Sequence, residues 1–258
     1  MTRRPLLASA CLFTGLLLTA SACATLGLEH PPTARQALPT VQESSSGTSS
    51  NPAAAPGLTE AQAHAALITD TDLGPPWTPT RGAATWRDGL LKATTPTAEC
   101  QKLLDRLYAD EVLGGPARAV VALDDPHSEA QLRYQLTDRS PAQADRALAW
   151  LETLPEKCAQ FAAKAPDDTV LEVTVAELPL PEVGDVRQGL RVTLTDWNTD
   201  DAEPLVLAVD VAAVRVGQDT FALTNGGLND VPNEATQAAV QLGVQRLTEV
   251  RKQGRVEI

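Results

Sequence analysis

The chain has few aromatic and basic residues, and each shortage narrows what the protein can do. Aromatic residues make up only 3% of the sequence, so a core has to be built largely from Leu, Val and Ala. Acidic residues outnumber Lys and Arg by 33 to 21, which gives a formal net charge of -12. A surface this acidic repels phosphate backbones and anionic lipid headgroups. We therefore expect no nucleic-acid partner and no binding to membranes by charge alone.

Familiar catalytic signatures are missing as well. The sequence contains no G-x-S-x-G elbow, no H-E-x-x-H helix and no glycine-rich phosphate loop. Only three histidines occur, and His127 stands in a turn sequence, Asp125-Pro126-His127, that is typical of a surface loop. These absences predict a protein without catalytic activity and without a cofactor.

No apolar run is long enough to form a membrane-spanning helix. The run Leu6–Leu18 has about 13 residues, whereas about 20 are needed. It follows two arginines and precedes small residues, which predicts a signal peptide over residues 1–22. Cys23 comes next, as in the lipobox of bacterial lipoproteins, where the cysteine carries the lipid. We expect a lipid anchor on Cys23 and a location on the extracytoplasmic face of the cell membrane. Ala20-Ser21-Ala22 also fits ordinary secretory cleavage, so plain secretion is the alternative.

Residues 23–57 combine Cys23 with a stretch rich in Pro, Ser, Thr, Ala and Gly. The stretch has no apolar periodicity and cannot bury enough surface to offset the entropy of ordering. It predicts a flexible stalk that carries a folded domain at residues 58–258.

Two cysteines remain in the folded part. Cys100 and Cys158 each lie on the apolar face of a predicted helix, and an even pair in an exported protein predicts a disulfide. Two buried free thiols are the alternative.

Local patterns predict a single α+β domain with a mostly antiparallel sheet packed by helices. Capping boxes at Thr59–Gln62 and Ser140–Gln143 predict two helix starts. The second helix is expected to continue through Phe161 with a kink or break at Pro155. Alternating apolar residues predict strands through the second half, and the continuous run after Leu205 predicts a strand covered on both faces.

Two further boundaries are predicted from turn chemistry. Asp88-Gly89 predicts the turn of a hairpin over Trp86–Ala93. Asn225-Gly226-Gly227 predicts the end of a strand that contains Phe221.

Candidate binding residues lie on the predicted connections. Trp77 and Trp197 stand in loops, where they could line a binding surface. Asp196, Asn198 and Asp200 place oxygen ligands at alternate positions, as in the first half of an EF-hand loop. Asp201 replaces the glycine of that motif and Leu207 its closing glutamate. A solvated acidic hairpin is therefore the favoured interpretation, with a weak metal site as the alternative.

The run Leu67-Ile68-Thr69-Asp70-Thr71-Asp72-Leu73-Gly74-Pro75-Pro76-Trp77 is similar to the opening of the PknH-type extracellular sensor-like domain. The later helical Cys100, the helical run Cys158-Ala159-Gln160-Phe161 and the β-rich half closed by a helix are similar to it too. The resemblance covers roughly residues 59–255. This family occurs in actinobacteria, as the outer domain of receptor kinases and as free lipoproteins. The resemblance implies a ligand-sensing domain with a cleft.

These features predict an extracytoplasmic lipoprotein whose domain binds an unknown small molecule or protein without catalysis. An envelope hydrolase or accessory factor that uses an acidic pair is one alternative, and a structural envelope protein is another. Two close carboxylates with raised pKa in a cleft would favour the enzyme. An apolar cleft beside Trp77 or Trp197 would favour the binding protein.

Overall fold

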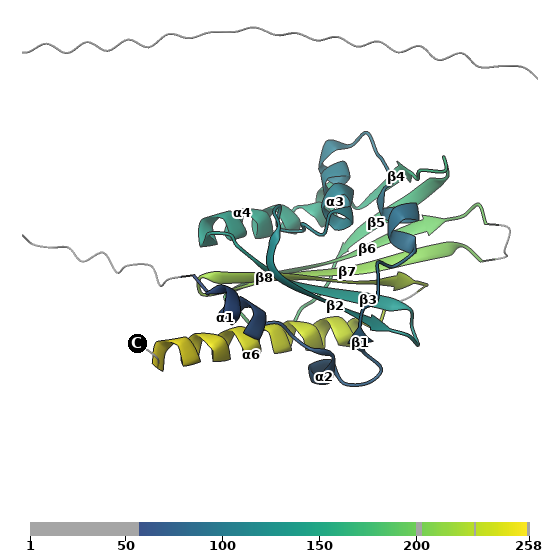
Figure 1. The fold of residues 1–258 in the computed structure, drawn as a ribbon. Helices are drawn as coiled ribbons and strands as arrows, with labels where there is room; N and C mark the ends of the chain where they lie inside the picture. Colours follow the sequence, from purple (N-terminus) through teal and green to yellow (C-terminus); the bar gives the residue numbers. More distant parts are fainter. Residues whose placement is uncertain (1–56, 200–202, 230, 257–258) are drawn as a thin grey trace, which may run out of the picture. The chain divides into compact units, whose positions relative to one another are not determined.

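The computed structural model describes residues 57–199, 203–229 and 231–256. All of them belong to one unit of the chain, Pro52–Ile258. The predicted signal peptide, Cys23 and almost all of the predicted stalk lie outside the described residues. The described part has the predicted α+β architecture, with one antiparallel sheet and helices on both of its faces (Figure 1).

Within the described residues the sheet has eight strands, in the order β1-β2-β3-β8-β7-β6-β5-β4. Every neighbouring pair is antiparallel. The strands are β1 (Thr78–Pro79), β2 (Ala117–Asp125), β3 (Ala130–Thr137), β4 (Gln160–Lys164), β5 (Val170–Glu177), β6 (Val186–Asp196), β7 (Leu205–Val216) and β8 (Asp219–Leu228). The central strand β7 is covered on both faces, as predicted, because Val209 and Val211 pack in one core and Ala212 and Val214 in the other.

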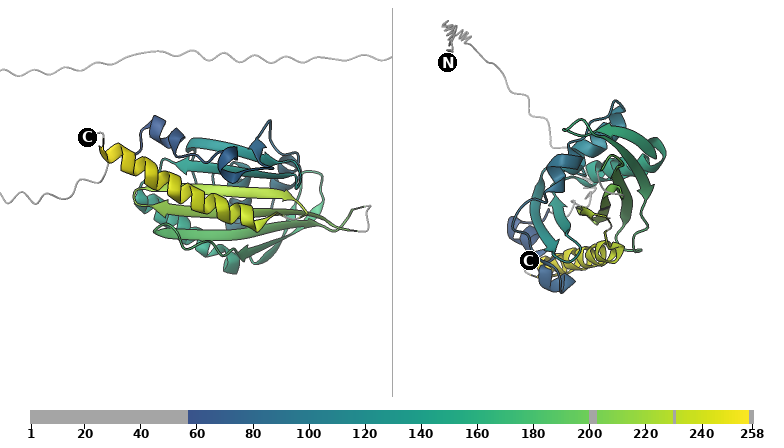
Figure 2. Two further views of the ribbon diagram at one scale, coloured as in Figure 1. Left: turned by 90° about the horizontal axis from the view of Figure 1, so that it is seen from below. Right: turned by 90° about the vertical axis from the view of Figure 1, so that its right-hand side faces the viewer.

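Helices form the two outer layers. They are α1 (Glu60–Ala65), α2 (Asp70–Leu73), the π-helix η1 (Arg87–Leu91), α3 (Ala98–Tyr108), α4 (Pro141–Glu152), α5 (Leu154–Lys157) and α6 (Asn233–Val256). Helices α3, α4 and α5 pack on one face of the sheet, and α1 and α6 pack on the other (Figure 1). Figure 2 shows α6 lying across the strands. In the described part, no helix is long and apolar enough to cross a membrane.

Both predicted capping boxes are present. At α1, the Gln62 N–H donates to Thr59 Oγ1 at 3.2 Å, and the Thr59 N–H donates to Gln62 Oε1 at 2.9 Å. Ser140 and Gln143 form the same reciprocal pair at the start of α4.

A buried polar network holds the start of α6 against the sheet. Asp210 on β7 is fully buried, and its carboxylate accepts hydrogen bonds from Arg191 Nε at 2.7 Å and from Thr236 Oγ1 at 2.9 Å. Asn225 on β8 donates to the same hydroxyl at 3.2 Å. Because an uncompensated buried carboxylate is costly, this arrangement fixes where α6 can begin.

The predicted disulfide is confirmed. Cys100 on α3 and Cys158 at the end of α5 are joined with an S–S distance of 2.04 Å. Both cysteines are buried in the core on the α3 side of the sheet. The bond therefore ties two helical segments that are 58 residues apart in the sequence.

The predicted hairpin over Trp86–Ala93 is wrong, because this segment contains the π-helix η1. Trp86 and Leu91 are both buried in the same core. A π-helical turn brings residues five apart onto one side, whereas strand alternation would put these two residues on opposite sides. Side-chain burial therefore prevails over the turn signal of Asp88-Gly89.

Two other predicted boundaries also differ. The chain breaks near Pro155 as predicted, into α4 and α5, but Phe161 lies in strand β4 and not in a helix. Asn225-Gly226-Gly227 does not end a strand, because β8 continues to Leu228. The glycines are there because neighbouring groups approach the strand closely: a Cβ on Gly227 would lie 3.2 Å from Cα of Ala130.

Candidate functional site

A pocket of about 270 Å³ opens where several strands of the sheet begin or end. Its walls come from the turn between β4 and β5, the end of β6, the start of β7, the end of β8 and the segment that contains η1. The antiparallel order brings these segments together although they are far apart in the sequence. The pocket is thus a product of strand register and not of any local motif.

The walls of the pocket are mainly apolar. The apolar residues that line it are Trp86, Leu90, Ala165, Leu171, Leu205 and Leu228. Trp86 is 9% exposed, and its ring lies against β8 at Gly226. The buried Nε1 of this indole has no hydrogen-bond partner among the described residues. Trp86 therefore contributes a large apolar surface to the pocket.

Two carboxylates supply negative charge to the pocket. Asp167 lies in the turn before β5, and its Oδ1 accepts a hydrogen bond from the Thr169 N–H at 3.1 Å. That hydrogen bond lowers the pKa of Asp167 below its usual range. Asp196, the last residue of β6, accepts a hydrogen bond from the Asn198 N–H at 2.8 Å. Asp167 is therefore ionised at neutral pH, which suits a hydrogen-bond acceptor or a partner for a cation.

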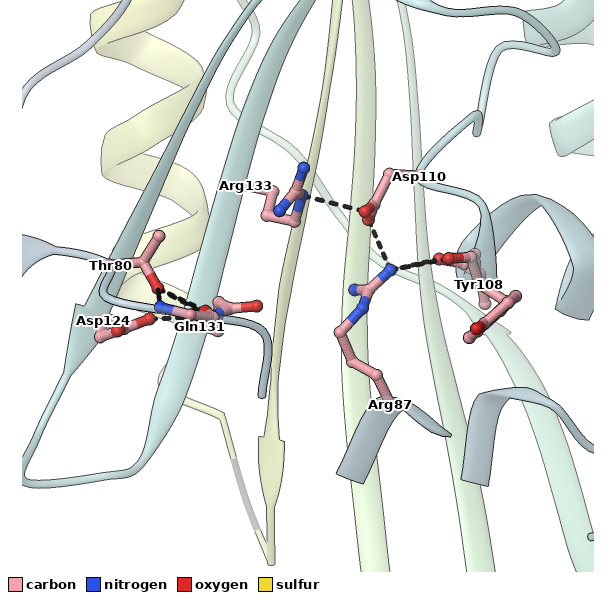
Figure 3. A network of polar contacts seen from close by, with 9 residues as sticks. Thr80, Arg87, Tyr108, Asp110, Asp124, Gln131 and Arg133 are labelled. Carbon is pink, nitrogen blue, oxygen red and sulfur yellow. Dashed lines mark hydrogen bonds and ion pairs between the residues drawn. The ribbon is translucent and has the colours of Figure 1, made fainter. Parts of the chain in front are cut away.

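A polar network lies on the same side of the sheet (Figure 3). Arg87 and Arg133 both approach Asp110, the residue that follows the end of α3 by two positions. Nearby, Gln131 on β3 is 5% exposed, and its Nε2 donates to Thr80 Oγ1 at 3.1 Å and to Asp124 Oδ1 at 2.9 Å. The sequence pattern does not indicate this network. Gln131 and Arg133 alternate with apolar residues, a pattern that predicts polar side chains on the solvent-facing side of a strand.

Neither of the two tryptophans named from the sequence lines the pocket. Trp77 is 8% exposed and packs in the core beneath α6. Trp197 is 64% exposed and donates from Nε1 to Glu172 Oε2 at 2.9 Å. The tryptophan that lines the pocket is Trp86, which the sequence did not single out.

The oxygen-rich loop is only partly described. Asp196 belongs to the pocket wall and Asn198 lies beside it, while Asp200 is outside the described residues. Among the residues that the structure describes, no three His, Cys, Asp or Glu side chains are grouped closely enough to hold a metal ion. The weak metal site remains a prediction.

No protein-family model matches the chain, and no curated protein matches it. One similar solved structure is the extracellular domain of PknH from Mycobacterium tuberculosis, with a TM-score of 0.44 and 16% sequence identity. The match covers 76% of this chain and 98% of that one. The function proposed below rests on the pocket residues of this chain.

Proposed function

We propose that this chain is a membrane-anchored lipoprotein whose extracytoplasmic domain binds a small ligand in the pocket beside Trp86, without catalysis. The observation that supports this function is the pocket itself, with apolar walls and two carboxylates among its lining residues. A concave, mostly apolar site with a few polar groups is the usual form of a small-molecule site.

The lining residues favour a particular class of ligand. Trp86, Leu171 and Leu228 suit an apolar body, while Asp167 and Asp196 suit an ammonium or hydroxyl group that donates hydrogen bonds. The volume of about 270 Å³ is slightly below the common range for ligand pockets, about 300–1,000 Å³, so the bound part of the ligand is small. We infer a small amphipathic ligand with a cationic or hydroxylated end.

The charge state of Asp167 bears on the alternative of a hydrolase with an acidic pair. Such a pair needs one carboxyl whose pKa is raised, so that it holds a proton at neutral pH. The hydrogen bond from the Thr169 N–H instead lowers the pKa of Asp167. Asp167 therefore does not supply the protonated carboxyl of such a pair, and the mainly apolar lining of the pocket is what favours binding without catalysis.

The proposed location rests on the sequence. The apolar run, the small residues and Cys23 support export and a lipid anchor. A strongly acidic domain gains little from anionic lipid, so a covalent anchor would be what keeps it at the membrane.

Two probes that differ in charge test the binding site. Phenethylamine and 3-phenylpropionate share an aromatic ring on a short chain, but one is a cation and the other an anion at neutral pH. In isothermal titration calorimetry we expect phenethylamine to bind and 3-phenylpropionate to bind at least tenfold more weakly, because the carboxylates repel it.

A blocking variant shows whether binding occurs in this pocket. Leu205→Trp enlarges a lining side chain and should abolish binding of the amine. Val120→Trp is the matched control, because Val120 is also exposed on a strand, at 44%, but does not line the pocket. Equal binding of the amine to both variants, or no saturable binding of either probe to the unmodified domain, would contradict the proposed function.

A further inference from the structure

Three charged side chains meet between η1, β3 and the segment after α3 (Figure 3). Arg87 Nη2 lies 2.8 Å from Asp110 Oδ1, and Arg133 Nε lies 3.1 Å from Asp110 Oδ2. The side chains of Arg87, Asp110 and Arg133 are 9%, 20% and 25% exposed. One carboxylate thus faces two guanidinium groups in a largely buried place, which leaves a local excess of one positive charge.

Arg87 has other partners that stabilise its charge. Its Nη2 donates to the carbonyl of Leu107 at 3.2 Å and to the carbonyl of Tyr108 at 2.9 Å. These carbonyls belong to the last turn of α3, where the helix dipole favours a cation. Arg87 therefore has a structural role, in which it joins η1 to the end of α3.

The hydrogen-bonding groups of Arg133 are less well paired than those of Arg87. Its Nε and Oδ1 of Asp110 are buried, yet neither atom makes a hydrogen bond with good geometry to a described residue. The contact between Arg133 and Asp110 is an ion pair held by charge and not by a directed hydrogen bond. A buried donor whose acceptor is poorly aligned is costly, so the position favours an additional acceptor next to Arg133.

The sheet around Arg133 is polar where the same layer is elsewhere apolar. Gln131 and Gln135 lie two residues to either side on the same face of β3, and Thr224 is the direct partner of Arg133 on β8. All three are buried, at 5%, 4% and 6% exposure. Farther along the sheet, the corresponding face of β5, β6 and β7 is lined by Leu and Val. Buried amides and a hydroxyl beside an arginine are the surroundings that a polar ligand needs.

We propose that Arg133 and these neighbours form a second site, which binds a small oxyanion such as a carboxylate or a phosphate group. The anion neutralises the excess charge of the cluster and accepts charge-assisted hydrogen bonds from the guanidinium. The Thr224 hydroxyl and the Gln135 amide offer donors to its remaining oxygens. This site selects the opposite charge from the pocket of Asp167 and Asp196, so it is independent of the proposed function.

Anion titrations of the intact domain test this site. The probes are inorganic phosphate and acetate, each compared with chloride at the same ionic strength so that general screening cancels. We expect saturable binding in calorimetry. At 100 times the dissociation constant, we expect a rise in melting temperature of roughly 5–10 °C. The probe that binds more tightly distinguishes a phosphate site from a carboxylate site.

Two variants assign the binding to Arg133. Arg133→Gln should weaken anion binding at least tenfold. Arg187→Gln should leave it unchanged, because Arg187 pairs only loosely, at 3.7 Å, with the exposed Glu182 on another part of the sheet. Arg133→Lys keeps the charge but lacks the planar fork, so it should bind with intermediate affinity, and it replaces Arg133→Gln if that variant does not fold. The proposal is overturned if the unmodified domain shows no saturable response to either anion. It is also overturned if the variant of Arg133 that folds binds within threefold of the unmodified domain.

Discussion

The indole of Trp86 packs directly on Gly226. A Cβ atom at this glycine would lie 2.8 Å from Cη2 of the ring, closer than side-chain carbons approach one another in proteins. The same Cβ would lie 3.3 Å from Val209 on the neighbouring strand. A small shift of β8 away from the ring therefore cannot make room for the Cβ. A glycine within strand β8 is therefore what allows Trp86 to form a wall of the pocket.

Gly226→Ala is expected to destabilise the domain by about 1–3 kcal/mol, the usual cost of inserting a methyl group into a filled core. Urea denaturation measures the change. Gly82→Ala is the control, because no atom lies within 4 Å of a Cβ at that position, and its effect should stay within about 0.5 kcal/mol. Equal stability of the two variants would show that the contact between Trp86 and Gly226 is not needed.

Loss of the disulfide is expected to lower the free energy of unfolding. The bond closes a loop of 58 residues, for which chain entropy predicts about 4 kcal/mol, less whatever structure the unfolded chain retains. The Cys100→Ala, Cys158→Ala double variant should therefore unfold at markedly lower urea concentration. A reducing agent should destabilise the natural domain and leave the double variant unaffected. A double variant as stable as the oxidised natural domain would contradict this account.

The stability contributed by Asp72 should depend on pH. Asp72 in α2 accepts two hydrogen bonds from Arg246 in α6, at 2.5 and 2.7 Å. Burial raises the pKa of Asp72, and the hydrogen bonds from Arg246 and Thr69 lower it. The lowering is the larger effect, so the net shift of the pKa is downward. A carboxyl with a lowered pKa stabilises the fold above its unfolded pKa of about 3.9, and this contribution is lost as the pH falls through the folded pKa.

Asp72→Asn should therefore cost about 1–2 kcal/mol at pH 7, since the arginine is partly exposed. The difference from the natural domain should stay constant down to about pH 5 and shrink below about pH 4. Asp168→Asn is the control: Asp168 forms an exposed ion pair with Lys164, and its loss should cost less than about 0.5 kcal/mol. Denaturation between pH 7 and pH 3 measures both variants, and a pH-independent difference for Asp72→Asn would contradict the assignment.

The loop that begins at Asp196 is expected to bind calcium only weakly. It lacks the glycine and the closing glutamate of an EF-hand, so the dissociation constant should be about 10⁻⁴ to 10⁻³ M or weaker. Calorimetric titration with calcium chloride measures it. Micromolar binding that is lost in an Asp196→Asn, Asp200→Asn double variant would instead make this loop a functional site.

Cys23 is expected to carry the lipid anchor. Mass spectrometry of the mature protein should find a lipidated cysteine at the N-terminus, and Cys23→Ala should move the protein from the membrane fraction to the soluble fraction. An unmodified N-terminus, or a variant that still fractionates with membranes, would favour plain secretion or another form of attachment.

Local chemistry explains which parts of the fold could be predicted. The hydroxyl–amide pairs at Thr59 and Ser140 act within four residues of sequence, so they specify helix starts wherever they occur. The cysteines could be paired because only two remained and both lay on apolar helix faces. Strand β7 could be recognised as two-sided because its apolar residues are continuous.

The parts that could not be predicted depend on contacts between distant segments. The π-helix η1 forms because Trp86 and Leu91 must reach one core, and Gly226 lies within β8 because Trp86 packs on it. Asp167 and Asp196 meet in one pocket only through the register of β5 with β6. The sequence pattern predicts that Arg133 lies on the surface, because nothing near it in the sequence indicates its contact with Asp110.

The pairing of β3 with β8 has a consequence for biogenesis. Thr137 and Thr220 pair across these strands although 83 residues separate them. Strand β3, with β2 and β1 beside it, therefore joins the rest of the sheet only when nearly the whole chain is present. Such long-range closure makes folding slow. For a protein exported as proposed, slow closure of this sheet favours translocation of the chain before it folds. The same delay leaves the edge of β3 open in the emerging chain, where an extracytoplasmic chaperone could bind until β8 arrives.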